Sequence, residues 1–169
     1  MSKRAVNLLR NMAVPFKRDA TNPVHGYHKV VSAAAAKTLT AADSGAIIYW
    51  TQSDAHDITL PTAQPGLCFT FHIIAGSAHN HYIVTQSADK VYGKATVQIL
   101  EDGAHDQDFQ VLAKGVGKDK VWLKSDATTG GGGTGDIVHV YCDVAGYWFC
   151  NAGLHSTGGT IGTIVVFQD

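Results

Sequence analysis

The chain has 169 residues, of which 45 % are apolar and only 16 % are charged, and its formal net charge is −1. This length accommodates one domain with a proper core and one short tail. The near-zero net charge gives no general reason to expect nucleic acid or a membrane as a partner, and no apolar run approaches the length of a membrane span. A low charge fraction with 18 glycines is typical of an all-β protein, or of one that buries surface against other copies or a larger assembly.

Residues 1–28 combine basic charge with the absence of a strand pattern. Residues 1–19 hold five basic residues and one acidic residue, a net charge of +4, whereas the remaining 150 residues carry a net charge of −5. Two interpretations are open: a frayed terminus, or an arm that becomes ordered against a partner. The apolar side chains in this segment favour the arm. We expect the following arm residues to contact a partner or a neighbouring copy: Lys3, Arg4, Leu8, Leu9, Arg10, Phe16, Lys17 and Arg18.

Residues 29–169 are predicted to form a single β domain. Residues 32–37 form either a helical turn or a linker, and the β region begins at Thr38. Residues 41–45 (A-A-D-S-G) predict a turn, because aspartate and serine cap backbone N–H groups and glycine accepts positive φ. Residues 46–52 are rich in β-forming residues and predict a strand.

The stretch 57–74 is expected to be the centre of the β core. Its first extended run ends at Pro61, which has no N–H for a ladder. Pro65 and Gly66 then predict a turn. In the second run Phe69, Phe71 and Ile73 point to one face, and Cys68, Thr70, His72 and Ile74 point to the other.

Further short runs follow at spacings near those of sandwiches and barrels. Residues 91–93 are expected to turn a corner, and residues 128–135 form a Thr/Gly loop. The predicted strands are 81–86, 96–100, 109–113, 120–124, 136–143, 146–151 and 162–168, and the last one completes a sheet in its own subunit or in a neighbour. The pattern predicts an all-β, antiparallel sandwich or barrel that is jelly-roll-like.

None of the candidate catalytic or metal-binding motifs is complete. Residues 130–133 are four glycines, but the Lys-Ser/Thr and helix of a P-loop do not follow. His79 and His81 share a face of a predicted strand, which suits a metal or a site on a symmetry axis, yet no further ligand follows at a recognisable spacing. Asp106 and Asp108 lack the calcium-loop pattern and are expected in a solvated turn. We expect no catalytic residue, no metal and no cofactor.

The three cysteines are expected to be reduced, because the short apolar run after the first basic residues does not form a secretory signal. Cys142 and Cys150 lie on one predicted hairpin, but a one-residue change of register decides whether they face each other. The aromatic residues have two interpretations, a sugar-stacking platform or core and interface packing, and we favour an interface. They are Tyr49, Trp50, Trp122, Tyr141, Tyr147 and Trp148.

Four segments in a fixed order resemble β domains that recur in structural proteins of tailed bacteriophages. They read T-L-T-A-A-D-S-G (38–45), D-I-T-L-P-x4-G-L-x-F-T-F (57–71), A-D-x-V-x-G (88–93) and G-D-I-V-H-V-Y-C-D-x-A-G-Y-W-F (135–149). The resemblance covers residues 37–151 and implies a structural role in the virion, commonly as a trimer. It carries over no catalytic residues, and residues 1–28 lie outside it.

The chain is therefore expected to be a capsid decoration, or cement, protein. It is expected to be made in the host cytoplasm, to form a homo-oligomer, a trimer, and to bind the major capsid protein on the outside of an icosahedral head. The alternative is a tail or fibre adhesion module that binds host surface glycan through its aromatic residues. A third hypothesis, a lyase or hydrolase, requires a cleft with converging acids or histidines.

Overall fold

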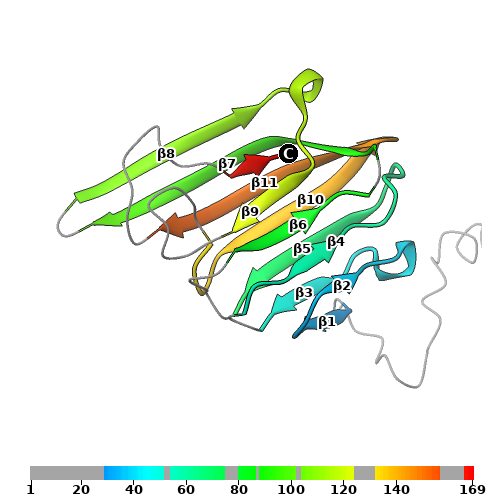
Figure 1. Cartoon of the computed structure of the whole chain (residues 1–169), viewed down its shortest axis with the longest axis horizontal. Helices are drawn as coiled ribbons and strands as arrows, with labels where there is room; N and C mark the ends of the chain where they lie inside the picture. Colours follow the sequence, from blue (N-terminus) through cyan, green and yellow to red (C-terminus); the bar gives the residue numbers. More distant parts are fainter. Residues whose placement is uncertain are drawn as a thin grey trace, which may run out of the picture.

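The computed structural model describes residues 29–51, 54–74, 80–86, 88–101, 104–123, 132–156 and 166–169. These residues fold into two β-sheets that pack face to face as a sandwich (Figure 1). The prediction of an all-β sandwich is confirmed. Both sheets are mixed, because five of the ten described strand pairings are parallel, in place of the antiparallel pairing that the sequence suggested.

The two sheets differ in size. The seven-stranded sheet has the spatial order β1 (Val30–Ala33), β3 (Ile47–Trp50), β5 (Cys68–Ile73), β10 (Ile137–Val144), β11 (Tyr147–Ser156), β7 (Lys90–Glu101) and β8 (Ala104–Leu112). The five-stranded sheet has the order β12 (Phe167–Gln168), β9 (Lys120–Leu123), β6 (His81–Val84), β4 (Asp57–Thr59) and β2 (Lys37–Thr38). Two 3-10 helices, η1 (Ala41–Asp43) and η2 (Lys114–Val116), lie in connections. Within the described residues no helix has the length and apolar character needed to cross a membrane.

The first six strands alternate between the sheets, so the chain winds as three successive coils. β1, β3 and β5 stack in parallel in one sheet, and β2, β4 and β6 stack in parallel in the other. Parallel neighbours need a crossover connection. Here the strand in the opposite sheet provides that crossover, and no α-helix is required.

The hairpin of β10 and β11 occupies the middle of the seven-stranded sheet. β10 pairs antiparallel with β5, and β11 pairs in parallel with β7 along the whole of β11, from Tyr147 opposite Lys90 to Ser156 opposite Ile99. The three-coil stack and the β7–β8 hairpin are therefore connected within this sheet by the β10–β11 hairpin.

The core lies between the sheets, because alternate residues of each strand face inward. Phe69, Phe71 and Ile73 are buried, as the alternation in β5 predicts. Trp50 and Trp148 are the largest fully buried side chains, with Trp148 5.8 Å from Phe69 and Trp50 6.4 Å from Phe71 between ring centroids. Burying each such side chain contributes about 1.5–3 kcal/mol.

Cys142 and Cys150 also face this core, and both are reduced. Cys150 lies opposite Val140, two residues before Cys142, so the thiols are diagonal neighbours on adjacent strands. The Cys142 thiol donates a hydrogen bond to the Val144 carbonyl at 3.2 Å. Burial raises the pKa of Cys150 to about 12, which keeps this thiol protonated and unreactive.

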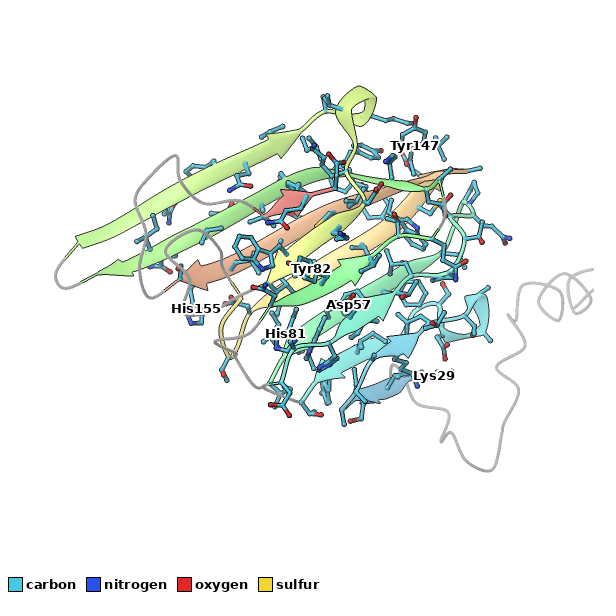
Figure 2. All side chains as sticks on the ribbon, in the orientation of Figure 1. Lys29, Asp57, His81, Tyr82, Tyr147 and His155 are labelled. Atoms are coloured by element: carbon cyan, nitrogen blue, oxygen red, sulfur yellow. The ribbon has the colours of Figure 1, made fainter. Side chains whose placement is uncertain are left out.

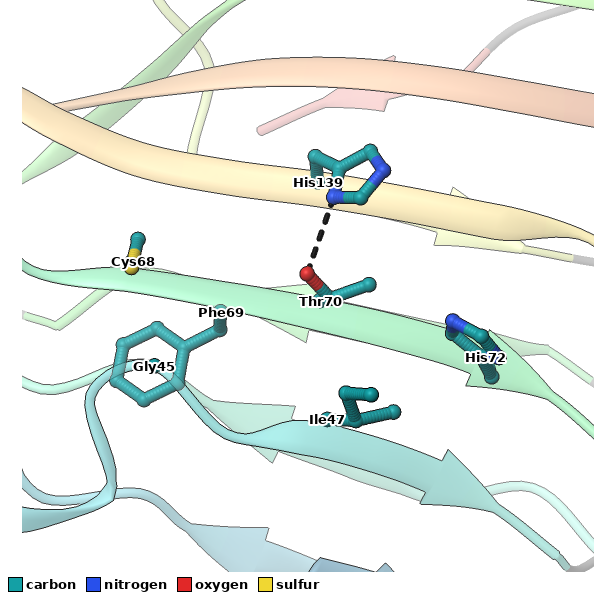
Figure 3. A pocket seen from close by; sticks show the side chains of 7 residues that line it. All are labelled: Gly45, Ile47, Cys68, Phe69, Thr70, His72 and His139. Carbon is teal, nitrogen blue, oxygen red and sulfur yellow. Dashed lines mark hydrogen bonds between the residues drawn. The ribbon is translucent and has the colours of Figure 1, made fainter. Parts of the chain in front are cut away.

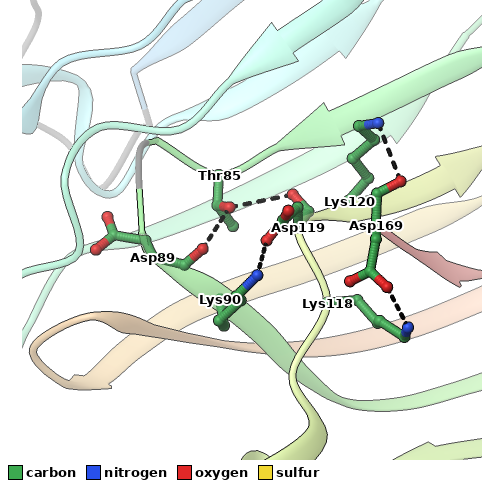
Figure 4. A network of polar contacts seen from close by, with 7 residues as sticks. All are labelled: Thr85, Asp89, Lys90, Lys118, Asp119, Lys120 and Asp169. Atoms are coloured by element: carbon green, nitrogen blue, oxygen red, sulfur yellow. Dashed lines mark hydrogen bonds and ion pairs between the residues drawn. The ribbon is translucent and has the colours of Figure 1, made fainter.

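One surface ion pair joins the first residue of β7 to the segment between η2 and β9, and a second joins this segment to Asp169 (Figure 4). Lys90 pairs with Asp119, and Lys118 pairs with Asp169, whose carbonyl also accepts a hydrogen bond from Lys120. Exposed pairs of this kind contribute about 0–1 kcal/mol each. They therefore position the last residues against β9 more than they stabilise the fold.

Several predicted elements differ from the structure. Residues 30–33 form β1, although the sequence suggested a helical turn or linker from residue 32. Residues 91–93 do not turn a corner; they lie inside the 12-residue strand β7. The backbone of residues 106–108 lies in β8 and not in a turn. The last strand pairs with β9 of the same subunit and, among the described residues, contains only Phe167 and Gln168.

Glycine is required at position 93, where β7 pairs in parallel with β11 and lies against the backbone of Cys150. The φ of Gly93 is +133°, and a Cβ there would overlap the Cys150 carbonyl oxygen and lie 2.8 Å from the Cys150 nitrogen. We expect Gly93→Ala to destabilise the protein by about 3 kcal/mol or more, through overpacking and backbone strain. Urea unfolding measures this. Gly153→Ala on β11 is the control, because nothing lies within 4 Å of its Cβ position; equal destabilisation by both changes would contradict the prediction.

Asp43 caps η1 and makes stability depend on pH. Its carboxylate accepts hydrogen bonds from Lys29 Nζ at 2.6 Å, Thr40 N at 2.9 Å and Thr40 Oγ1 at 2.8 Å. These contacts, Lys29 first, lower the pKa of Asp43 to about 2 from its ordinary 3.8. The stabilisation is present above the unfolded-state pKa and is lost as pH falls through the folded-state value.

We therefore expect Asp43→Asn to lower the unfolding free energy near neutral pH by about 1 kcal/mol or less. The difference from the parent protein narrows between about pH 4 and pH 2, as the parent carboxylate takes up its proton. Urea unfolding at several pH values gives both curves. A difference that stays constant across this range would show that the carboxylate charge is not involved.

Candidate interaction surface

The outward side of the seven-stranded sheet is the largest regular surface of the described structure. Strand pairing places one outward residue of each strand beside the next, as in the row that runs from Val30 through Thr70 and Asn151 to Val111. We define the outer face by 18 of the outward residues: Val30, Ser32, Ile47, Tyr49, Cys68, Thr70, His72, Tyr92, Lys94, Thr96, Phe109, Val111, Ile137, His139, Tyr141, Phe149, Asn151 and Gly153. Six further described residues also occupy outward positions of these strands and are not included in this set: Lys90, Gln98, Gln107, Asp143, Tyr147 and His155.

Charge is nearly absent from this outer face. Of its 18 residues only Lys94 carries a charge at neutral pH when the histidines are neutral, and the six further outward positions add one charge of each sign, Lys90 and Asp143. Large apolar side chains are instead exposed, notably Val111 at 82 %, Phe109 at 66 % and Tyr141 at 44 %. A sheet that faces water on one side normally alternates apolar inward with polar outward residues. Exposed apolar residues that gather into a patch are typical of interaction surfaces, which makes this face the candidate.

Four rings form an aromatic cluster where the outer face meets the β10–β11 turn. Phe149 lies between Tyr141, at 4.9 Å, and Tyr92, at 5.3 Å, and Tyr147 adjoins Tyr92 at 6.3 Å between centroids. The Lys114 ammonium lies 4.8 Å from the Tyr147 ring centroid, a cation–π distance. The Lys114 side chain, from η2, therefore packs against the Tyr147 end of this cluster.

Tyr92 is further fixed through its hydroxyl group, which donates a hydrogen bond to Asp143 Oδ2 at 2.8 Å. Burial, and then this hydrogen bond and the charge of Asp143, raise the pKa of Tyr92 to about 12. The phenol is thus neutral throughout the physiological range. It acts as a hydrogen-bond donor and not as an acid.

A shallow hollow of about 310 Å³ lies at the centre of the outer face (Figure 3). Thr70 Oγ1 and His139 Nδ1 are hydrogen-bonded across it at 3.0 Å, and His72 packs against Tyr49 at 5.7 Å. Its lining residues are Gly45, Ile47, Cys68, Phe69, Thr70, His72 and His139. Among the described residues there is no group of three or more His, Cys, Asp or Glu side chains that could hold a metal ion.

Asp136, which is buried, and His155, which is half-buried, form a pair at the other end of β10. Asp136 Oδ1 accepts a hydrogen bond from His155 Nδ1 at 2.7 Å, and Oδ2 accepts from the backbone N–H groups of Gly133 and His155, both at 2.8 Å. Burial raises the pKa of Asp136, and the hydrogen bonds from His155 and Gly133 oppose this shift. The other side of the imidazole lies against Gly133, where a Cβ would overlap the ring. The pair therefore attaches the turn before β10 to β11.

The residues singled out from the sequence are placed as follows. All eight arm residues (Lys3, Arg4, Leu8, Leu9, Arg10, Phe16, Lys17 and Arg18) lie outside the described residues, as does His79. His81 is buried, with its ring 4.9 Å from Trp50 and 5.0 Å from His56, so it does not lie at an exposed site.

The six aromatic residues divide between core and surface. Trp50 and Trp148 belong to the core and cannot stack on a sugar. Tyr49, Tyr141 and Tyr147 lie on the outward side of the seven-stranded sheet, Tyr141 exposed and the other two half-buried, and their place in an interface stays a prediction. Trp122 is half-buried on the opposite sheet.

Sequence reasoning missed the outer face as a whole, and also Tyr92, Phe149 and the pair of Asp136 with His155. The available signal was the scarcity of charge at alternate positions of β5, β10 and β11. Comparison of the chain with protein-family models, with curated proteins and with solved structures finds no match.

The apolar character of the outer face has a direct test. We expect the double change Phe109→Glu and Val111→Glu to weaken retention on a hydrophobic-interaction column, with the unfolding free energy changed by about 0.5 kcal/mol or less because both side chains are exposed. Lys37→Glu, at an exposed position of β2 on the other sheet, changes the net charge by the same two units and is the matched control. Equal loss of retention in both variants would mean that total charge, and not this face, governs the behaviour.

Proposed function

We propose that this chain is a structural protein of a bacteriophage virion. In this proposal it is a capsid decoration, or cement, protein that binds the outside of the icosahedral head and stabilises contacts between capsomers. The observation that carries the proposal is the outer face, a regular sheet surface in which 17 of 18 residues are uncharged, as are 21 of the 24 outward positions named above. Such a surface is suited to permanent contact with protein, because leaving it in water exposes apolar area.

The size of the outer face supports this role. Neighbouring strands lie about 4.8 Å apart and residues rise about 3.3 Å each, so the rows span about 30 Å by 20 Å, or about 600 Å² before side-chain relief is counted. A standard interface takes about 800 Å² from each partner. One outer face is therefore comparable with one side of a stable interface, and many copies on a shell multiply its effect through avidity.

The proposal assigns the contacts as follows. The outer face meets the major capsid protein or the neighbouring copies of a trimer. The basic arm, residues 1–28, is assigned to contacts with the shell or a neighbouring copy. A chain of 28 extended residues spans up to about 90 Å, which is enough to cross its own sheet and reach an adjacent subunit. No reaction is part of the proposal.

The proposed role is tested with expanded, undecorated heads of the phage that encodes the chain. We expect the full-length protein to have a solution mass three times 17.9 kDa and to bind the heads in a regular array visible by electron microscopy. The variant with Glu at positions 109 and 111 is expected to bind at least tenfold more weakly, and Lys37→Glu, which changes the net charge equally, is expected to bind like the parent. Heads that remain bare with the full-length protein would overturn the proposal.

The arm has a separate test. Deleting residues 1–28 is expected to leave a folded body, since the described core residues of 29–169 pack against one another in one cluster between the two sheets, but one that no longer decorates heads. Thermal unfolding establishes the fold of the truncated protein before binding is measured. Binding by this protein with undiminished affinity would refute the role of the arm while leaving the role of the outer face open to the test above.

A further inference from the structure

The opposite side of the sandwich carries a second, more polar hollow. It is an open hollow with a volume of about 490 Å³, and it lies beside the beginnings of β4 and β6. Figure 2 shows Asp57, His81 and Tyr82 together in this region. The lining residues are Ala36, Ala55, His56, Asp57, Asn80 and Tyr82.

Two of the lining side chains are held in position by hydrogen bonds. Asn80 Oδ1 accepts a hydrogen bond from Trp122 Nε1 at 3.0 Å, so the amide oxygen is engaged and the NH₂ group is left to donate elsewhere. His56 Nδ1 donates to the Asp54 carbonyl at 2.8 Å, and its ring packs 5.1 Å from Trp50. Fixed side chains lose little freedom on binding, which favours affinity.

The remaining two lining groups supply a ring and an acceptor. Tyr82 on β6 lies directly opposite Asp57 on β4, so the half-buried phenol ring and the exposed carboxylate are adjacent. The Lys120 ammonium lies 5.6 Å from the Tyr82 ring centroid, but it comes from β9, on the side of β6 away from β4. The side of Tyr82 toward Asp57 is therefore the side that faces the hollow.

The lining chemistry selects one class of ligand. A pyranose ring has an apolar C–H face that packs on an aromatic ring, and hydroxyl groups that both donate and accept hydrogen bonds. Tyr82 offers the ring, Asp57 the acceptor and Asn80 the donor. Among the described residues that line the hollow there is no Lys or Arg, and the nearest ammonium, that of Lys120, belongs to the β9 side of Tyr82, so a phosphate or carboxylate beside Asp57 would meet its negative charge first. Ala36 and Ala55 leave room for a ring between these groups.

We propose that this hollow binds a neutral carbohydrate, with one sugar ring packed on Tyr82 and its hydroxyl groups hydrogen-bonded to Asp57 and Asn80. The site is on the five-stranded sheet, whereas the outer face belongs to the seven-stranded sheet. A subunit that covers its outer face against protein therefore still presents the hollow to its surroundings. The inference stands on its own residues and does not require the decoration role.

The test uses the full-length protein and saturation-transfer NMR. The probes are four neutral sugars, the methyl glycosides of glucose, galactose, mannose and N-acetylglucosamine, together with glucuronate and tetramethylammonium. We expect at least one neutral glycoside to bind with a dissociation constant of about 1 mM or tighter. A neutral-glycan array then identifies the preferred linkage.

Variants locate the site. We expect Asp57→Asn and Asn80→Ala each to weaken binding about tenfold or more, which corresponds to about 1.4 kcal/mol, and Tyr82→Ala to abolish it. Asp143→Asn, on the seven-stranded sheet, is the matched control and is expected to bind like the parent. Thermal unfolding accompanies each variant. If Tyr82→Ala fails to fold, the exposed changes at positions 57 and 80 decide the outcome.

Three results would overturn the inference. The first is the absence of binding by every neutral glycoside and array glycan. The second is binding that is unchanged by Asp57→Asn and by Asn80→Ala, which would place the sugar elsewhere. The third is stronger binding of glucuronate or tetramethylammonium than of any neutral sugar, which would assign the hollow to a charged ligand. Failure of these tests leaves head decoration unaffected, because that role depends on the other sheet.

Discussion

The pairing of the β10–β11 hairpin with its two neighbours is the constraint on which the seven-stranded sheet depends. On one side β10 completes the ladder of β5, and on the other side β11 runs in parallel with β7 for the whole of its length. The hairpin also brings Trp148 against Phe69. Both the core and the outer face exist only when this late segment of the chain has been inserted between two earlier ones. Such long-range pairing is intrinsically slow to form.

The same hairpin explains why the two surfaces of the sandwich differ. Its outward residues include Ile137, Tyr141 and Phe149, which join uncharged side chains of β5 to those of β7 and β8. The smaller sheet has no corresponding insertion, and its outward residues include Asp57 and Lys120 beside Tyr82 and Trp122. The same sandwich thus carries a nearly uncharged surface on its larger sheet. On its smaller sheet it carries a hollow that is lined in part by Asp57, Asn80 and Tyr82.

The sequence predicted what is local and missed what depends on pairing. Alternation in β5, the turn at Gly66 and the β10–β11 hairpin were readable, because a period of two and a positive-φ glycine leave direct traces. Alternation does not reveal which sheet a strand joins. The winding of β1–β6 between sheets, and with it the parallel pairing, could not be predicted. Gly93 suggested a corner, whereas the structure uses it for close approach to Cys150.

The candidate sites were hidden for the same reason. Cys68, His139 and Tyr141 are far apart or unremarkable in the chain, and only the register of β5 with β10 makes them neighbours on one surface. Asp57 and Tyr82 are 25 residues apart and become adjacent through the pairing of β4 with β6. Residues that make a surface across strands leave no motif in the linear sequence.

The winding of the first six strands has a consequence for how such a chain changes over evolution. β1 and β2 are each the last strand of their own sheet, so the first coil is a terminal layer in both sheets at once. Duplication or loss of one such layer lengthens or shortens the molecule without disturbing the hairpins at the far end. The sandwich can therefore widen in steps of one layer, and each step adds one strand to each sheet.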